Sequence, residues 1–457
     1  MRLLRQFWAC DRTVQFLLLN HLAMMLGFSM VLPYVTGYLS TTLGFAASMV
    51  GLVLGLRTFS QQGLGVIGGI LADQWGYKPL IAAGCALRVA GFLLFGFCQT
   101  LPGALGAAFL SGLGGALFEP AMRAYLAAES GDQRVDAFAL FSICEAVGAC
   151  LGPLLSVALF PHSFRGLCLT ASGIFGALTL VQLRSLPPQE PHEGTTRQPD
   201  ASSWREVLAN RTFVGFAVGM VGYLTLYNQL YLSLPLEVRR LTGNDAGTGV
   251  LLTGATLLAV MAQGPITAFV QTRWRPLQAI ALGLALMGGA FLPLLATSAW
   301  VPVNVLQATD ATLWSRVLPV AITLSPVCVS AMLLMLGTML VQPCVLSLIP
   351  MLGDHRLLGT YYGGYYLVQG SGAVVGNLMI GAALDAGQRL GVPSVPWLLL
   401  LGLGAASAMR IAALDRQRRA APVTTLTAAP CTVAVPSSAV QSAHTLALQE
   451  QTTDFLR

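Results

Sequence analysis

Charged side chains are scarce in this sequence, since they make up 10% of its 457 residues. A soluble domain carries roughly 25% charged residues, so the composition excludes an ordinary soluble domain. Lysine occurs once, at Lys78, and the arginines are scattered through short segments instead of forming a block. Nucleic-acid-binding proteins concentrate basic residues on one surface, so we expect no nucleic-acid partner.

The usual signatures of catalytic, metal and nucleotide sites are also missing. The five histidines are far apart, and the nine cysteines contain no C-x-x-C pair. Neither H-E-x-x-H nor G-x-S-x-G with triad partners occurs, and no Walker A motif is present. We therefore expect no metal, no cofactor and no ATP-driven step, and we expect the cysteines to be small buried apolar residues.

Long apolar runs are abundant, with 55% hydrophobic residues and a mean hydropathy of +0.69. A helix needs ~20 apolar residues to cross a bilayer, and continuous runs favour helices over a β-barrel. The first run follows three arginines, as in a signal peptide, but it is too long for one. The sequence predicts an all-α membrane protein with twelve transmembrane helices, at about residues 14–38, 46–70, 79–98, 102–126, 137–160, 164–183, 213–235, 247–270, 277–297, 319–349, 358–384 and 395–414.

The runs divide the chain into two sets of six. We expect an N-terminal six-helix half over 1–183, a proline-rich solvated linker over 184–212, a C-terminal half over 213–414 and a disordered tail over 415–457. Loops on the side away from the N-terminus hold few basic residues, namely Arg165, Arg239, Arg240, Arg316 and Arg389. Because basic loops stay inside, both termini, the linker and the tail are expected in the cytoplasm.

The turn between the second and third runs carries a recognisable pattern, GILADQWGYKP, from Gly69 to Pro79. Gly69 is expected to allow close approach of a neighbouring helix, and Gly76 a turn that side chains resist. The stretch resembles motif A of the major facilitator superfamily, although Gln74 and Tyr77 replace two of its arginines. The residues that keep the motif are Gly69, Leu71, Ala72, Asp73, Gly76 and Lys78.

An internal repeat supports that resemblance. The stretch from Leu113 to Pro120 matches that from Leu336 to Pro343, and Glu145 to Gly152 matches Gln369 to Gly376. Two parallel six-helix repeats imply the major facilitator fold, with a substrate site between the halves near the membrane centre. Each glutamate of the first half meets a glutamine in the second, so acid chemistry is expected in the N-terminal half.

Gly148, Gly152 and Pro153 resemble motif C of the drug:proton antiporters, while Ala108 stands where motif B has an arginine. The stretch from Arg57 to Gly65, the run Phe118-Glu119-Pro120 and the position of Arg88 together resemble the MdtH-like branch of these antiporters. The resemblance implies a functional monomer in the bacterial cytoplasmic (inner) membrane. It implies proton-driven export of a small organic molecule, either a drug or a secreted metabolite such as a siderophore.

Four charged residues fall deep inside apolar runs, away from their ends, namely Arg57, Arg88, Glu119 and Glu145. A charge at the centre of a span costs about 3 kcal/mol, so each needs a partner or a function. One reading is structural ion pairing. The other is a gate and charge cluster, formed by Gly69, Asp73, Gly76, Lys78, Arg88 and Arg123, beside a proton-coupling carboxylate. We favour Glu145 for the proton, because it has no basic neighbour at helical spacing, and keep Glu119 as the second candidate.

Tyr223 and Tyr227 recur at a spacing of four with Tyr231, next to Asn228. They are expected either in an aromatic belt or along a cavity that stacks on flat substrates. We assign the substrate cavity to His21, Arg57, Tyr223, Tyr227 and Asn228, although a satisfied core histidine explains His21 better than a place in the cavity wall.

Three other functions stay open at this point. A proton-coupled importer of a small nutrient shares the same fold. A non-transporting membrane sensor would tolerate the altered motif A. An intramembrane enzyme would need a catalytic set that the sequence does not display.

Overall fold

The computed structural model describes residues 7–8, 10–131, 134–159, 163–186, 201–243, 246–298, 313–353 and 357–420, and the described residues contain no strand. Helices dominate because a backbone in lipid must satisfy its hydrogen bonds within each segment. In chain order the elements are α2 Arg12–Gly37, η1 Tyr38–Thr42, α3 Ala47–Thr58, η2 Phe59–Gly63, α4 Gly65–Trp75, α5 Tyr77–Phe97, α6 Leu101–Glu129, α7 Arg134–Leu159, α8 Phe164–Ser185, α9 Ala201–Ala209, α10 Arg211–Gly219, α11 Val221–Asn228, α12 Ser233–Thr242, α13 Ala246–Arg273, α14 Pro276–Gly289, α15 Leu292–Thr297, α16 Leu313–Leu352, α17 Leu358–Leu390 and α18 Val395–Ala420.

The predicted all-α membrane fold is confirmed. Eleven helical segments of the described residues are long and apolar enough to cross a bilayer. The remaining predicted span, the second, falls on α3, η2 and α4, where a π-helical turn interrupts the α-helix. The seventh and ninth spans are also built from consecutive shorter helices, α10 to α12 and α14 to α15.

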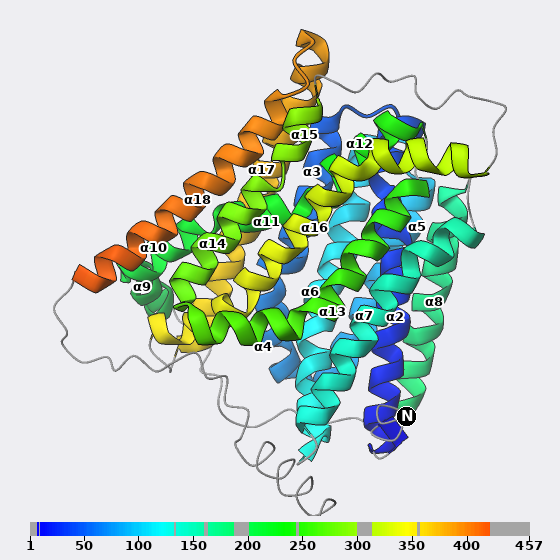
Figure 1. Cartoon of the computed structure of the whole chain (residues 1–457). Coiled ribbons are helices and arrows are strands. Elements are labelled where there is room, and N and C mark those ends of the chain that lie inside the picture. Colours follow the sequence, from blue (N-terminus) through cyan, green and yellow to red (C-terminus); the bar gives the residue numbers. More distant parts are fainter. Residues whose placement is uncertain are drawn as a thin grey trace, which may run out of the picture.

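Two separate hydrophobic cores divide the molecule. One core takes its residues from Cys10 to Leu186 together with Leu232, and the other from Val207 to Ile411. In Figure 1 the N-terminal half, blue to teal, stands upright, while the C-terminal half leans away from it. The two halves therefore spread apart toward the face that carries the start of α2, here called the N-terminal face; the opposite one is the far face.

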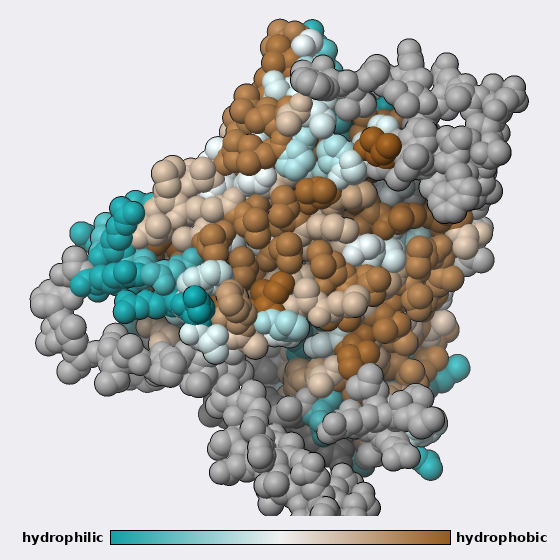
Figure 2. Space-filling view, viewed as in Figure 1, coloured by the Kyte–Doolittle hydropathy of each residue, from teal (hydrophilic) through white to brown (hydrophobic). Residues whose placement is uncertain are grey.

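The surface between these faces is apolar. Figure 2 shows a broad brown area over the middle of α13, α14 and α16, with hydrophilic residues gathered toward its edges. The large exposed apolar side chains of these three helices include Leu257, Val260, Met261, Phe269, Leu282 and Met332. A soluble protein rarely exposes so continuous an apolar area, so this surface faces lipid.

The expected solvated linker contains a packed helix, α9. Val207 of α9 is buried in the C-terminal core. Asn210 then caps α10 by accepting from the Phe213 amide at 3.1 Å, and its Nδ2 donates to the Leu352 carbonyl at 2.8 Å. The end of the expected linker is thus tied to the C-terminal half. The expected tail begins as helix, because α18 continues to Ala420.

The far face closes the space between the halves. Asp385 of α17 caps α3: its Oδ1 and Oδ2 accept from the Ala47 and Ser48 amides at 2.8 and 3.0 Å. A Cβ on Gly51 would overlap the Asn377 carbonyl oxygen, so α3 and α17 touch backbone to backbone. On the other side, Thr253 of α13 donates to the Cys150 carbonyl of α7 at 3.3 Å.

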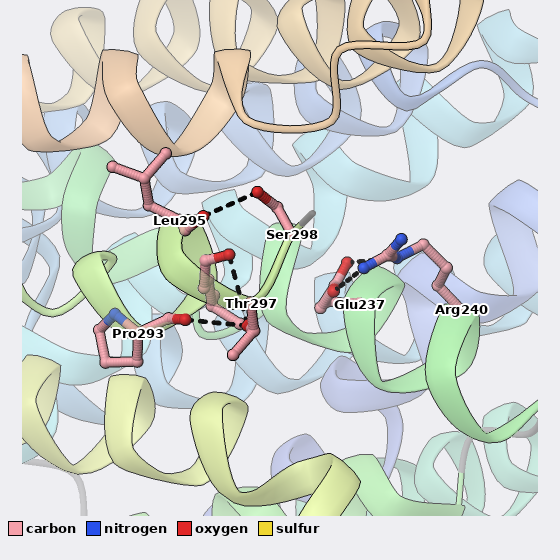
Figure 3. Close-up of polar contacts among 7 residues, drawn as sticks. Glu237, Arg240, Pro293, Leu295, Thr297 and Ser298 are labelled. Carbon is pink, nitrogen blue, oxygen red and sulfur yellow. Dashed lines mark hydrogen bonds and ion pairs between the residues drawn. The ribbon is translucent and has the colours of Figure 1, made fainter. Parts of the chain in front are cut away.

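The far-face end of the C-terminal half also holds an acidic residue that the sequence analysis did not consider. Glu237 pairs with Arg240 one turn later on α12, as Figure 3 shows. Nearby, Thr297 and Ser298 donate to carbonyls of their own helix end, those of Pro293 and Leu295. These contacts satisfy polar groups locally, so we assign Glu237 a structural role within α12.

Candidate functional site: a cavity between the halves

A cavity of about 430 Å³ lies between the halves. Four spans of each half contribute to it: α2, α3 with η2, α6 and α7 from the first, and α10–α12, α13, α16 and α17 from the second. Its polar lining residues are Ser29, Arg57, Thr58, Gln61, Gln62, Glu119, Arg123, Glu145, Tyr223, Tyr227, Asn228, Tyr231, Gln263, Thr338, Gln342, Tyr365 and Tyr366. The far-face contacts close one end, and the lining reaches toward the N-terminal face as far as Arg123 and Gln263.

The π turn η2 shapes the floor of this cavity. It widens the helix so that two consecutive side chains, Gln61 and Gln62, both line the cavity. A Cβ on Gly112 of α6 would overlap Ser60 Oγ, so a glycine is needed where α6 passes this turn. π turns in α-helices are uncommon and cluster at functional sites.

A chain of polar contacts runs from the cavity into the N-terminal core. Arg57 Nη2 donates to Gln61 Oε1 at 2.9 Å, and Gln61 Nε2 donates to Glu119 Oε1 at 2.6 Å. The same Glu119 oxygen lies 3.6 Å from Arg88 Nη2. Arg88 and Glu119 therefore form an ion pair between α5 and α6, as the structural reading of the intramembrane charges would require.

Arg88 is the buried end of that chain. Its side chain is fully inaccessible, and among the described residues its guanidinium nitrogens have no hydrogen-bond partner. Instead the guanidinium lies over the rings of Phe28 and Phe175, at 4.9 and 5.6 Å from their centroids. Such contacts contribute about 2 kcal/mol when desolvated. A Cβ on Gly115 would lie 2.7 Å from Nη2, so this glycine makes room for the cation.

Arg123 does not complete the predicted charge cluster. It lines the cavity with Glu119, but it is exposed and forms no ion pair within the described part of the chain. Water solvates an exposed guanidinium well, so nothing forces it onto Glu119. Lys78 lies half-buried at the start of α5, also without an ion pair to a described residue. The side chain of Asp73 lies outside the described residues.

The prediction that Gly69 allows a neighbouring helix to approach closely is wrong. Gly68, the residue before it, is the one that lies against another helix. A Cβ on Gly69 would meet nothing within 4 Å, whereas one on Gly68 would overlap the Ala116 carbonyl oxygen of α6. The sequence pattern does not reveal which glycine of the pair faces α6, because η2 shifts the helical phase before it. Gly76 adopts φ +84°, which confirms the turn that a side chain would resist.

Glu145 differs from Glu119 in having no partner. It lies near the middle of α7 and lines the cavity, and within the described structure no hydrogen bond or ion pair involves its carboxylate. Its repeat counterpart Gln369 is in another environment, since it is fully buried and donates to the Ala217 carbonyl at 3.4 Å. Although Glu145 and Gln369 match in the sequence repeat, their surroundings therefore differ.

The residues of the antiporter motif pack against α2 and do not line the cavity. A Cβ on Gly148 would lie 2.6 Å from Met25 Cβ, and one on Gly152 the same distance from Ser29 Cβ. The Pro153 carbonyl accepts from Tyr34 Oη at 3.1 Å. This motif therefore sets how closely α7 approaches α2, and thereby places Glu145.

The cavity wall opposite these charges is aromatic. Tyr223, Tyr227 and Tyr231 all line it, and α17 adds Tyr365 and Tyr366, which the sequence analysis missed. Their signal was the run Tyr361, Tyr362, Tyr365, Tyr366 on one helix. Asn228 spans the gap between the halves, donating from Nδ2 to Thr58 Oγ1 at 3.2 Å.

His21 does not belong to the cavity, contrary to the prediction. It is buried in the N-terminal half and stacks on Phe141 with 3.7 Å between ring centroids. Neither ring nitrogen has a hydrogen-bond partner among the described residues. Its neighbour in sequence, Asn20, accepts from Gln182 Nε2 at 2.8 Å. The contact between Asn20 and Gln182 joins α2 to α8 within the N-terminal half.

Comparison with known proteins identifies the fold and the family. The pattern of the Major Facilitator Superfamily matches residues 17–377. The chain belongs to the major facilitator superfamily. An uncharacterised MFS-type transporter of Mycobacterium tuberculosis is 36% identical over 88% of this chain and 94% of its own length. The multidrug resistance protein MdtH of Salmonella newport is 31% identical over 84% of this chain and 90% of its own.

Solved major facilitator structures share the fold at low identity. A crystal structure of a mutant of the nucleoside transporter NupG has a TM-score of 0.72, with 13% identity, and covers 88% of this chain and 100% of its own. A peptide transporter of the POT family in complex with sulfate has a TM-score of 0.71, with 14% identity, over 89% and 95%. The protein is thus a multi-pass membrane protein of a transporter superfamily, whose members are in general not enzymes.

Proposed function

We propose that the protein is a proton-coupled antiporter that exports a small organic molecule across the bacterial cytoplasmic membrane. The observation that carries this proposal is the cavity-lining carboxylate of Glu145, which has no ionic or hydrogen-bonding partner among the described residues. A carboxylate that makes no ion pair or hydrogen bond can bind and release a proton without breaking a contact within the protein.

Glu119 is less suited to exchange a proton on each cycle. It receives a hydrogen bond from Gln61 and lies against Arg88, so it already serves as the partner of two polar side chains of the N-terminal half. We assign it the role of counter-ion to Arg88, and Glu145 the role of proton carrier. The substrate and the proton would then occupy one cavity at different times, which is how exchange transporters couple two movements.

The arrangement of the halves supports alternating access. The cavity is closed toward the far face by Asp385 and by the Gly51 contact, and it reaches toward the N-terminal face. With both termini cytoplasmic, this is a state that loads substrate from inside. Breaking the far-face contacts and forming new ones near Asp73 and Lys78 would complete the cycle, with motif A as the inner gate.

The assay that tests this function uses inside-out membrane vesicles acidified by respiration. Aromatic organic acids, bases and neutral compounds are added singly, and the internal pH is followed with an acridine dye. Antiport predicts that a transported compound enters while protons leave, so the dye fluorescence recovers. Movement of both in the same direction would indicate the importer instead. If the folded protein exchanges protons for none of the compounds in the panel, the result would indicate the non-transporting sensor.

A further inference from the structure

Arg57 presents a permanent cation to the cavity without a balancing carboxylate. It lines the cavity near the middle of the span formed by α3, η2 and α4. Within the described part of the chain no acidic group lies at ion-pairing distance from its guanidinium. Its protein contacts are the amide oxygen of Gln61 and the ring of Phe28, 5.0 Å from the centroid.

The neighbouring carboxylate is already engaged. Glu119 meets Arg88 and Gln61, so the group of Arg57, Arg88 and Glu119 holds two cations and one anion. An unpaired carboxylate such as that of Glu145 can be neutralised by a proton. A guanidinium stays charged at all physiological pH values, so only an anion can neutralise it.

The residues that share the cavity with Arg57 indicate the chemical character of the anion that it would bind. Tyr227 and Tyr231 of the opposite half share the cavity with it, and their rings are 6.1 Å apart in an edge-to-face arrangement. Asn228 lies between them in sequence and bonds to Thr58, the residue after Arg57. A molecule held by Arg57 would therefore place its body against an aromatic wall.

We infer that the substrate is an organic anion with a flat aromatic body, bound through its acidic group to Arg57. This inference rests on the proposed function, because it takes the cavity to be the transport site. Arg57 acts as a specificity residue, since its planar N–H fork matches the two oxygens of a carboxylate. Arg123 is a poorer candidate, because it is exposed at the end nearer the N-terminal face.

Binding to the purified full-length protein in lipid nanodiscs tests this without any transport step. The probes are 2-naphthoate and the uncharged 2-naphthamide, which share one ring system, and 2-naphthylmethylammonium as the cation. The wild type is expected to bind the carboxylate at least tenfold tighter than the amide. Arg57→Gln should reduce that ratio to about one, and Arg57→Lys should keep part of it. Arg389→Gln, which changes an exposed arginine at the far face, is the matched control.

Three outcomes overturn the inference: equal or absent binding of naphthoate and naphthamide, tighter binding of the ammonium probe, or loss of the preference in Arg123→Gln but not in Arg57→Gln. Glu145→Gln separates this inference from the proposed function. It should keep the preference for the carboxylate even though it cannot couple to protons. A protein that prefers the anion but never exchanges protons would refute antiport while leaving the role of Arg57 intact.

Discussion

Arg88 is a buried cation around which several helices of the N-terminal half pack. Its cation is fully buried, with one carboxylate at 3.6 Å, two aromatic rings and a glycine around it. A buried ion pair adds little net stability over an apolar pair, but removing one partner strands the other. The carboxylate of Glu119 is therefore needed to stabilise the fold, whatever its role in transport.

Glu119→Ala is expected to destabilise the protein, because Arg88 then has no counter-ion among its described neighbours. Since a quarter of the Glu119 side chain is accessible, the loss should stay near or below roughly 3 kcal/mol. The measurement is the thermal midpoint in detergent, together with abundance in the membrane. Arg123→Ala is the control, since Arg123 is exposed, and equal losses in both variants would refute the pairing.

At the scale of single elements, the span formed by α3, η2 and α4 both lines the cavity and packs closely against α6. It carries Arg57, Gln61 and Gln62 into the cavity, and its flank lies against α6 through glycines. The π turn inside it sets the phase of everything that follows, including the side of the helix on which Gly68 and Gly69 lie. A substitution in this region should thus depend sharply on position.

Gly68→Ala and Gly69→Ala form a matched pair that tests this phase. A methyl at Gly68 meets the Ala116 backbone, which cannot move aside as a flexible side chain would, so about 1–3 kcal/mol should be lost. A methyl at Gly69 meets open space, and alanine is the better helix former, so stability should be unchanged or gain up to ~1 kcal/mol. The measurement is the thermal midpoint of each variant in detergent. A lower midpoint for Gly69→Ala than for Gly68→Ala would show that α4 is rotated from the orientation described.

Asp385 is the second element-scale test, because it joins α17 to the first turn of α3. Loss of a capping side chain costs about 1 kcal/mol, which changes a two-state ratio about fivefold. Asp385→Ala should therefore raise the population that is open at the far face. Spin labels at Thr42 and Leu390, both exposed, should show a larger fraction of long distances. Gln388→Ala is the control on the same helix end, and identical distributions in all variants would refute the cap.

At the scale of the whole molecule, the sequence predicted the helical membrane fold because long apolar runs leave few alternatives in lipid. The span boundaries agree with the helices to within several residues. What it did not predict was the local irregularity: the π turn at Phe59–Gly63, the three pieces of the seventh span, and the packed helix α9. These depend on contacts between distant segments, such as that of Asn210 with Leu352.

The lining of the cavity was predicted in part from the sequence. The predicted site residues that line it are Arg57, Glu119, Glu145, Tyr223, Tyr227 and Asn228. The place predicted for His21 was wrong, because a polar residue in an apolar run can face a cavity or another helix, and periodicity does not distinguish them. Tyr365, Tyr366 and the space that Gly115 leaves for Arg88 were not predicted. Those features appear only when α6, α5 and α17 are brought together in three dimensions.

The whole-molecule account depends on which carboxylate carries the proton. Within the described structure Glu145 faces the cavity unpaired, so Glu145→Gln should fold, since the amide keeps the shape and is exposed to the same cavity. It should still bind substrate but lose the ability to exchange it for protons. Glu119→Gln should transport at a reduced rate, because its amide oxygen can still accept from Gln61.

The most direct measurement is substrate accumulation driven by an imposed pH gradient in proteoliposomes, with binding measured separately on the same preparations. We predict that the wild type builds a substrate gradient, that Glu145→Gln binds without building one, and that Glu119→Gln builds a smaller one. If Glu145→Gln still accumulates substrate while Glu119→Gln does not, the two roles are reversed. Accumulation by both variants would contradict the account outright.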